Sequence, residues 1–287
     1  MKTAAFFLML AASHVAGATA QRWAPASIAS DQYESTPTFS PDGRELYFMR
    51  SDRQFRQWKI LESRCERGAW SQPQPVSFAA KAPALDADPF VSADGQRFYF
   101  VSTRQNAGVS EELDIWMARR RGDGWGEPER LPEPVNSSGS ELLPRETSDG
   151  KLYFGSDRAG GHGEGDIYIA TRGKDGSWNV ENAGPPLSSS ANEYEVDVTP
   201  DGKYAVVVAD RGTRSHLYRY GRRGGAWVEL GQVPADDSVF QVGPLMSPRG
   251  DRLLFAQRDG EKNSGEFYLI DLAKGADKTW PASCENL

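Results

Sequence analysis

The sequence predicts an all-β fold, a single β-propeller built from four-stranded antiparallel blades. Three observations support this prediction. A turn close to Ser-x-Asp-Gly lies between two short apolar segments and recurs five times at intervals of 48 to 55 residues, a tryptophan-containing segment follows each copy, and no stretch shows sustained helical periodicity. Four-stranded units that repeat every 40 to 50 residues or so are typical of propeller blades.

Each copy of the turn predicts the first hairpin of a blade. Glycine supplies the positive φ that a tight turn requires, and the flanking apolar segments then form the innermost strand and its neighbour. The five copies read TPTFSPDGRELYFMRSDR, ADPFVSADGQRFYFVSTR, LLPRETSDGKLYFGSDRAGG, YEVDVTPDGKYAVVVADRG and VGPLMSPRGDRLLFAQRDG, with the turn glycines Gly43, Gly95, Gly150, Gly202 and Gly250.

Two further strands complete each predicted blade. The third is a short apolar run, such as Asp114 to Met117 and Asp166 to Ile169. The fourth begins after a glycine-rich turn with a tryptophan, and these residues are Trp70, Trp125, Trp178, Trp227 and Trp280.

The chain from Gln21 onward accommodates five such blades, with six as the alternative. The 23 residues up to Gly43 and the 37 after Gly250 together make about one further period. Because Arg22 to Pro25 resembles the fourth-strand motif, the segments around Trp23 and Trp280 both qualify as the outer strand of the last blade. We expect one of them to close the ring and so remove an exposed sheet edge.

Residues 1–20 have the features of a secretory signal peptide, and residues 21–287 form the predicted propeller. Lys2 precedes an apolar stretch from Ala4 to Ala12, and Ala18-Thr19-Ala20 predicts cleavage after Ala20. We therefore expect a periplasmic or secreted monomer without a membrane span. Without Lys2, 32 basic residues face 40 acidic ones, a net charge of −8 that disfavours nucleic acid and anionic membranes as partners.

The two cysteines, Cys65 and Cys284, lie near the predicted outer strands of the first and last blades. In an oxidising compartment they could form a disulfide that ties the C-terminus to the first blade. Two unpaired thiols on different edges are the equally weighted alternative, because the sequence does not give their separation.

The repeat resembles that of the TolB-like (WD40-like) β-propeller repeat family. Its consensus of roughly Glu-x-x-Pro-x-Phe-Ser-Pro-Asp-Gly-x-x-Leu-Tyr-Phe-x-Ser-Asp-Arg is matched by Glu34 to Arg53 and, with changes, by Leu152 to Tyr168. The resemblance implies a propeller and says little about function, since such propellers act as scaffold proteins and as accessory domains. TolB itself has six blades and a separate N-terminal domain, so the resemblance concerns the propeller alone.

Aligning the repeats on their glycines reveals a column of residues, four of five acidic, where each innermost strand begins; we call it the acidic column. The column consists of Glu34, Asp86, Glu141, Glu193 and Gln241. We expect these residues at one mouth of the central channel, made more electronegative by Asp88, Glu195 and Asp197, with Arg145 as the one opposing charge. The column is a candidate binding ring, or it stabilises the blades.

An arginine ends the second strand of each blade: Arg53, Arg104, Arg158, Arg211 and Arg258. Because the hairpin reverses direction at the glycine, carboxylate and arginine emerge at the same end of the blade. We favour the interpretation that they form ion pairs within or between blades, since a residue repeated in every blade usually serves the blade.

Function is expected where the copies differ. The loops of unequal length on the acidic side are Gln105 to Leu113, Ala159 to Gly165 and Gly260 to Gly265, and we name His162 and Glu164 as binding-loop candidates. A lone histidine in a glycine-rich loop is more often a solvated surface residue than a ligand.

No motif of a serine hydrolase, a zinc hydrolase or a thiol redox enzyme occurs. We expect no catalytic residue, no cofactor and no metal, with a calcium ion at the acidic mouth as the alternative. The favoured function is a non-catalytic binding or scaffold module for a protein partner or a glycan. The alternative is a glycoside hydrolase in which two acids of the ring act as acid and base.

Overall fold

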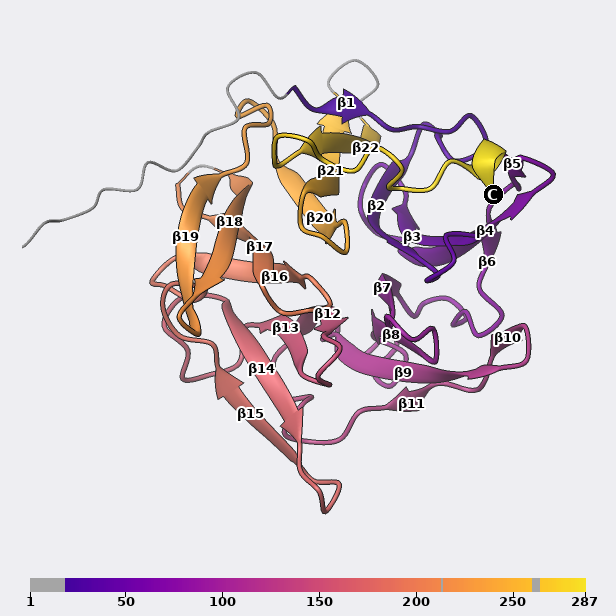
Figure 1. Cartoon of the computed structure of the whole chain (residues 1–287). Coiled ribbons are helices and arrows are strands. Elements are labelled where there is room, and N and C mark those ends of the chain that lie inside the picture. Colours follow the sequence, from indigo (N-terminus) through magenta and orange to yellow (C-terminus); the bar gives the residue numbers. More distant parts are fainter. Residues whose placement is uncertain (1–18, 213, 260–263) are drawn as a thin grey trace, which may run out of the picture.

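The computed structural model describes residues 19–212, 214–259 and 264–287. Its described residues form twenty-two strands and one short 3₁₀ helix, Cys284–Asn286. The strands surround a common axis (Figure 1), which confirms the predicted all-β propeller. The predicted signal peptide lies outside the described residues except for its last two. Among the described residues, no helix has the length and apolar character needed to cross a bilayer.

The described strands pair into four sheets, of nine, five, four and four strands. The nine-stranded sheet joins the first and last copies of the turn through one parallel pair, Tyr33 with Gly265. We divide it there and call the resulting antiparallel units blades 1 to 5. Blade 1 contains β2 (Tyr33–Phe39), β3 (Glu45–Ser51), β4 (Lys59–Glu66), β5 (Ala69–Trp70) and β6 (Gln74–Pro75). Blade 2 contains β7 (Asp86–Val91), β8 (Arg97–Ser102), β9 (Asp114–Arg121), β10 (Gly124–Trp125) and β11 (Glu129–Arg130).

The remaining blades follow the same order from the axis outward. Blade 3 contains β12 (Glu141–Glu146), β13 (Leu152–Ser156), β14 (Asp166–Arg172) and β15 (Trp178–Asn182). Blade 4 contains β16 (Asn192–Val198), β17 (Tyr204–Asp210), β18 (Ser215–Arg223) and β19 (Ala226–Gln232). Blade 5 contains β20 (Gln241–Met246), β21 (Arg252–Asp259) and β22 (Ser264–Asp271).

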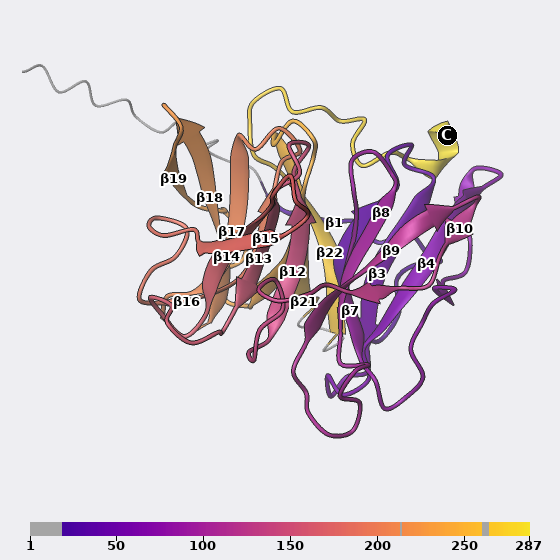
Figure 2. The same cartoon turned by 90° about the horizontal axis from the view of Figure 1, so that it is seen from below.

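The N-terminal segment supplies the outer strand of blade 5. β1 (Gln21–Arg22) pairs antiparallel with β22, and the amide of Trp23 donates to the carbonyl of Phe267 at 2.8 Å. Trp280, the other candidate for this position, lies outside any strand. The C-terminal segment, residues 272–287, instead runs along one end of the strands toward blade 1 (Figure 2).

The repeated turn has the geometry that its sequence predicts. In blade 1 the hydroxyl of Ser40 donates to Asp42 at 2.6 Å, the amide of Arg44 donates to the same carboxylate, and Gly43 has φ +72°. The fifth copy has arginine in place of this aspartate. There Ser247 donates to Asp251, one residue beyond the glycine, at 2.6 Å. A displaced carboxylate therefore preserves the serine contact of the turn.

A β-bulge interrupts each innermost strand just after its first residues. The residue two positions after the acidic column, in the bulge or directly after it, is Thr36, Asp88, Leu143, Glu195 or Gly243. Glycine is required in blade 5, because a Cβ on Gly243 would lie 2.5 Å from the amide nitrogen of Thr36. A bulge redirects the side chains that follow it, so each blade presents a different residue to the interior.

Apolar side chains fill the spaces between neighbouring blades. Tyr47 of blade 1 meets Phe98 of blade 2 edge to face, with ring centroids 4.9 Å apart. Phe48 of blade 1 meets Phe267 of blade 5 in the same way at 5.9 Å. These contacts pack neighbouring blades against one another.

Candidate functional site

The acidic column is buried. Glu34, Asp86, Glu141, Glu193 and Gln241 are each no more than 3% exposed. We call the four acids among them the repeated carboxylates. A buried ion requires hydrogen-bond partners or a counter-charge, so their surroundings decide what they do.

Glu141 shows the arrangement most completely. Its carboxylate accepts hydrogen bonds from the hydroxyls of Ser137 at 2.6 Å and Ser156 at 3.2 Å, and from the guanidinium of Arg158 at 2.9 Å. Arg158 also donates to the carbonyls of Pro134 and Val135. All of these residues belong to blade 3 or to the loop that leads into it, so this carboxylate fastens its own blade together.

In blades 2 and 4 the repeated carboxylate also lies near the arginine of its own blade, but the distance between the two groups differs. Arg104 donates to Asp86 at 2.9 Å. In blade 4 the hydroxyl of Ser189 donates to Glu193 at 2.6 Å, whereas Arg211 is 4.0 Å from that carboxylate. Arg211 instead makes its closer ion pair with Glu229, at 3.1 Å.

The prediction for blade 1 needs correction, because the partner of Glu34 is Arg50 rather than Arg53. Arg50 donates to Glu34 at 2.7 Å and lies directly opposite it in the strand pair. Arg53 follows the end of β3 and pairs with exposed Asp31 at 3.0 Å. In blades 2 to 4 the opposite residue is Ser102, Ser156 or Ala209. These small side chains leave room for the arginine two residues later.

Blade 5 departs from the scheme. Gln241 donates through Nε2 to the carbonyl of Asp236 at 2.8 Å. Its Oε1 is buried and has no hydrogen-bond partner among the described residues. Arg258 lies opposite Gly265 in the β21–β22 pair.

Burial raises the pKa values of two repeated carboxyls. Burial raises the pKa of Glu34 to about 7, although the Ser30 hydroxyl and Arg50 oppose this change. Burial likewise raises the pKa of Glu141, against the opposing effect of Ser137 and Arg158. The serine and arginine contacts thus offset part of the desolvation that the fold imposes.

A second charged group lies between the innermost strands, where the repeats differ. We call Asp88, Arg145, Glu195 and Asp197 the axial charges, and each is at most 8% exposed. Their hydrogen bonds join different blades. Asp88 accepts from the amide of Leu143 at 2.9 Å, Arg145 donates to Asp197 at 2.9 Å, and Glu195 accepts from the amide of Gly243 at 2.7 Å. The axial charges therefore connect blades 2 to 5 in sequence.

Burial raises the pKa of each of the three axial carboxyls, which share a single guanidinium. Burial, reinforced by the nearby Asp88 carboxyl, raises the pKa of Glu195 to about 8. Burial raises the pKa of Asp88 as well. Asp197 is raised less, to a pKa of about 6, because Arg145 favours its ionised form.

A cavity opens beside these charges at the end of the propeller that carries the repeated turns. We call it the turn-side cavity, and its volume is about 590 Å³. Blades 1, 2, 4 and 5 and the C-terminal segment line it. Its apolar walls are Phe39, Pro41, Phe90, Val91, Val198, Pro200, Leu245, Met246, Pro248, Trp280 and Ala282. Asp197 is its only axial charge, so the cavity ends where the charged group begins.

The opposite, loop-side end has two hollows, one between blades 3 and 4 and one between blade 4 and the loop that leads into it. One, of about 420 Å³, is lined by Glu164 with Ser140, Asn192 and Tyr194 among others. The second, of about 600 Å³, includes Arg211. His162 is exposed, and its backbone amide donates to Asp166 at 2.6 Å, so the loop is held by its main chain. In the predicted loop Gly260 to Gly265, residues 260–263 lie outside the described residues.

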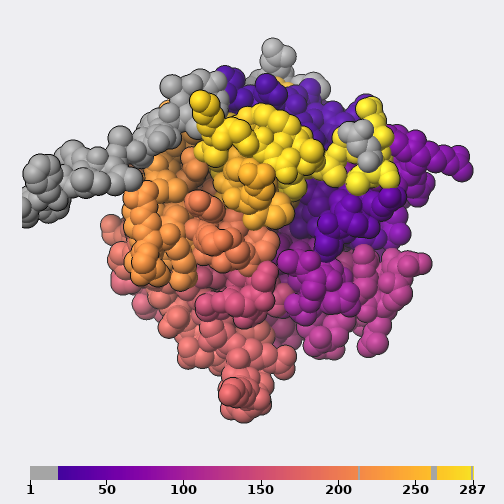
Figure 3. All heavy atoms as spheres, in the orientation of Figure 1, coloured from indigo at the N-terminus to yellow at the C-terminus, as the bar shows by residue number. Residues whose placement is uncertain are grey.

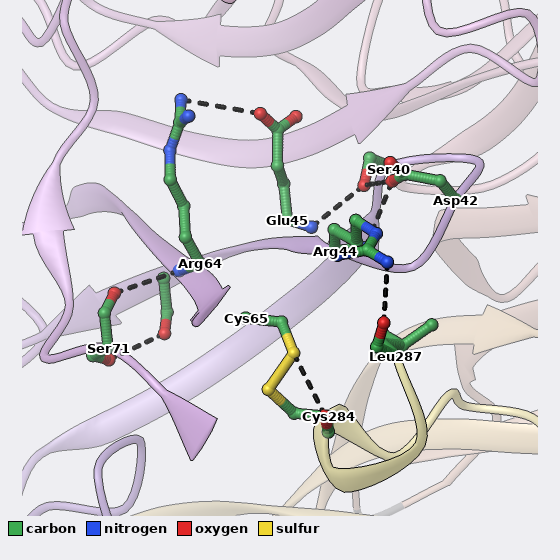
Figure 4. The surroundings of a disulfide bond; sticks show 10 residues. Ser40, Asp42, Arg44, Glu45, Arg64, Cys65, Ser71, Cys284 and Leu287 are labelled. Atoms are coloured by element: carbon green, nitrogen blue, oxygen red, sulfur yellow. Dashed lines mark hydrogen bonds and ion pairs between the residues drawn. A yellow bond between two sulfur atoms is a disulfide. The ribbon is translucent and has the colours of Figure 1, made fainter. Parts of the chain in front are cut away.

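The C-terminal segment reaches blade 1 through a disulfide between Cys65 and Cys284, whose Cα atoms are 5.4 Å apart. Figure 4 shows this bond beside Arg44, which donates to the carbonyl of Leu287 at 2.6 Å. The structure thus contains the pairing that the sequence left open. Within the part of the chain that the structure describes, no group of three or more His, Cys, Asp or Glu side chains is placed to hold a metal ion.

Sequence reasoning did not identify the turn-side cavity. Phe39 and Phe90 read as ordinary strand residues, and Trp280 was a candidate for an outer strand. The available signal was the C-terminal segment itself, which carries a cysteine and a tryptophan but lacks the alternating pattern of a strand.

No protein-family model matches the chain, and no curated protein sequence matches it. Among solved structures, TolB from Acinetobacter baumannii superposes with a TM-score of 0.53 and 18% identity over 86% of this chain and 56% of TolB. The chain therefore spans little more than half the length of TolB. Zg3597, a family 117 glycoside hydrolase from Zobellia galactanivorans, superposes with a TM-score of 0.60 and 13% identity over 91% of this chain and 92% of its own. Both similarities concern the fold.

Proposed function

We propose that the protein is an exported β-propeller of the TolB-like repeat type that binds a protein partner without catalysing a reaction. One observation carries this proposal. The repeated carboxylates, the most conspicuous acids of the sequence, are buried and bonded to serines and arginines mainly of their own blades. They stabilise blades and present no acid–base pair to solvent.

Export is supported by two features. Residues 1–20 have the composition of a signal peptide. The disulfide between Cys65 and Cys284 requires an oxidising compartment to persist. A periplasmic or extracellular location satisfies both.

Glycoside hydrolysis is the second candidate, and the axial charges are the observation that favours it. Glu195 keeps its proton near neutral pH while Asp197 borders the cavity, and such a pair is what the reaction requires. Both oxygens of Asp197 are occupied, however, one by Arg145 and the other by the amide of Met246. A glycan as a bound partner remains compatible with the loop-side hollows.

Photo-crosslinking in the native organism tests the binding function. A photoreactive residue is placed at Pro41 or Pro248 on the turn side, or at Glu164 on the loop side. The proposal expects a discrete crosslinked protein from one side of the propeller. Failure to crosslink any protein from either side would count against a protein partner.

Hydrolysis assays test the second candidate separately. Purified mature protein is incubated with arabinan, xylan and mannan beside the Asp197→Asn variant. We expect no release of reducing sugar by either protein. Release by the wild type that the variant lacks would favour the hydrolase.

A further inference from the structure

We propose that the C-terminal segment is a binding element that forms one wall of the turn-side cavity, and that the cavity takes an apolar side chain of the partner next to a basic residue. This inference deepens the proposed function and rests on it. It assigns a role to residues 272–287, which do not belong to any repeat.

The segment is not needed to close the ring, because β1 already supplies the outer strand of blade 5. It leaves the last blade and crosses to the first, as the yellow C-terminal atoms in Figure 3 show. On the way it contributes Asp277, Thr279, Trp280 and Ala282 to the cavity. Because the segment closes no sheet and lines this apolar cavity, we expect its role to concern what the cavity binds.

Several contacts fix the position of this wall. The disulfide holds its end to β4, and Arg44 donates to the carbonyl of Leu287. Near its middle, Arg252 donates to the carbonyl of Trp280, and the amide of Asp277 donates to Asp251 at 3.1 Å. The Trp280 ring meets Phe39 of blade 1 edge to face at 6.5 Å. The wall is thus pre-formed, which lowers the ordering cost of binding.

The side chains that form the walls of the cavity determine the polarity of the group that it binds. Trp280, Phe39 and Phe90 face the cavity together with Leu245 and Met246. Apolar walls of this kind favour an aromatic or aliphatic group that leaves water on binding. A polar sugar ring would find few hydrogen-bond partners among these five side chains.

The charged residues at the rim of the cavity determine the charge of the group that it binds. Asp42, Asp251 and Asp277 line the cavity against a single basic residue, Arg249. Burial opposes ionisation at Asp42 and Asp251, but hydrogen bonds from the hydroxyls of Ser40 and Ser247 lower their pKa values below the ordinary value. The Thr279 hydroxyl lowers the pKa of Asp277, so all three carboxyls stay ionised at neutral pH. Arg249 lies 3.3 Å from Asp251 and 3.9 Å from Asp277, while Arg44 and Arg252, which do not line the cavity, act on Asp42 and Asp277 from outside it. Among the lining residues of the rim, three carboxylates therefore face one guanidinium. Charge complementarity therefore selects a cation beside the apolar group.

A matched pair of small probes tests both properties. Phenethylammonium and 3-phenylpropanoate share an aromatic body and carry opposite charges. Their binding to the oxidised mature protein is measured by ligand-observed NMR titration. We expect the cation to bind at least about threefold more tightly than the anion. Equal affinities, or a preference for the anion, would overturn the assigned charge.

Variants of the C-terminal segment then test whether it contributes to probe binding. Trp280→Ala should weaken phenethylammonium binding at least about fivefold, whereas Phe55→Ala, an exposed aromatic in the loop after β3, should leave it unchanged. The double variant Cys65→Ser/Cys284→Ser keeps the β1 closure and should lose affinity to a similar degree while its near-ultraviolet circular dichroism stays native. If that variant fails to fold, Trp280→Ala decides the question with the disulfide intact.

The possible failures are distinguishable. Unchanged probe affinity in a folded Trp280→Ala protein would refute the role of the C-terminal segment, and crosslinks to a partner from the loop side would still support the binding function. Probe binding at the cavity without any crosslinked protein would still support the role of the C-terminal segment in forming the cavity, and it would refute the protein partner.

Discussion

The two ends of the propeller axis differ in how they use charge and repetition. At the loop-side end, the repeated carboxylates occur at the same position in four blades, are buried, and bond mainly within their own blade. Between the innermost strands and at the turn-side end lie features that are not shared by every blade, the axial charges and the C-terminal segment. They join different blades or line a cavity.

Residues shared by the blades and residues that differ between them are expected to have different roles. A position that is the same in every blade meets a need that every blade has, here the fastening of its first hairpin. A position whose residue differs between blades cannot serve a contact common to all blades, and it is a candidate for a role that occurs once in the molecule. The first kind of position should therefore govern stability alone, and the second kind should include the residues that govern binding.

The largest effect on stability is expected from Arg145→Met. The guanidinium is fully buried and is the only basic group among three axial carboxyls. Removing it leaves Asp197 without its counter-charge, and breaking a buried ion pair costs about 3–5 kcal/mol of unfolding free energy. Urea denaturation monitored by tryptophan fluorescence measures the difference.

Arg223→Met is the matched control, because Arg223 ends β18 and is exposed. It should stay within about 0.5 kcal/mol of the wild type. A loss below about 1 kcal/mol for Arg145→Met would show that the axial charges do not join the blades.

A smaller loss is expected from Glu141→Gln. The amide keeps the shape of the side chain but weakens the hydrogen bonds from Ser137 and Arg158, and we expect about 2–3 kcal/mol. Exposed Glu164→Gln in the same blade should change the unfolding free energy by less than about 0.5 kcal/mol. Equal effects of the two changes would contradict a stabilising role for the repeated carboxylates.

A separate effect concerns the pH dependence of stability. The pKa of Glu195 rises from an ordinary 4.5 to about 8 on folding, and that of Asp197 from 3.8 to about 6. Between the unfolded and folded pKa values the folded protein binds more protons, so its unfolding free energy falls as the pH rises. We expect wild-type stability to fall from about pH 5 to about pH 8.

Glu195→Gln isolates this contribution. The variant cannot ionise at position 195, so its decline over the same pH range should be shallower by at least about 1 kcal/mol. Denaturation midpoints at pH 5, 6.5 and 8 measure both proteins. Parallel declines in the two proteins would exclude Glu195 as the source.

The repeats made part of this structure predictable. The turns and the pairings of Asp86 with Arg104 and Glu141 with Arg158 follow from the alignment on the glycines, because register along a hairpin is fixed by its turn. The pairing of Glu34 was mispredicted, since Arg53 lies one residue farther from its turn glycine than Arg104 does from its own. Arg50, opposite Glu34, takes its place.

The cavity was not predictable for a physical reason. Its wall belongs to a segment without period or strand pattern, and the path of that segment depends on long-range contacts such as the bond between Cys65 and Cys284, 219 residues apart in sequence. The bulges, which decide whether Asp88 or Asp197 meets another blade, likewise depend on pairing geometry rather than on a local motif.

The most direct test of the account compares phenethylammonium affinity in Glu141→Gln and Trp280→Ala, each measured where the variant is fully folded. The repeated carboxylates serve the blades and the C-terminal segment serves binding, so Glu141→Gln should stay within about twofold of the wild type and Trp280→Ala should bind at least about fivefold more weakly. The reverse order, with affinity lost in folded Glu141→Gln and retained in Trp280→Ala, would contradict it.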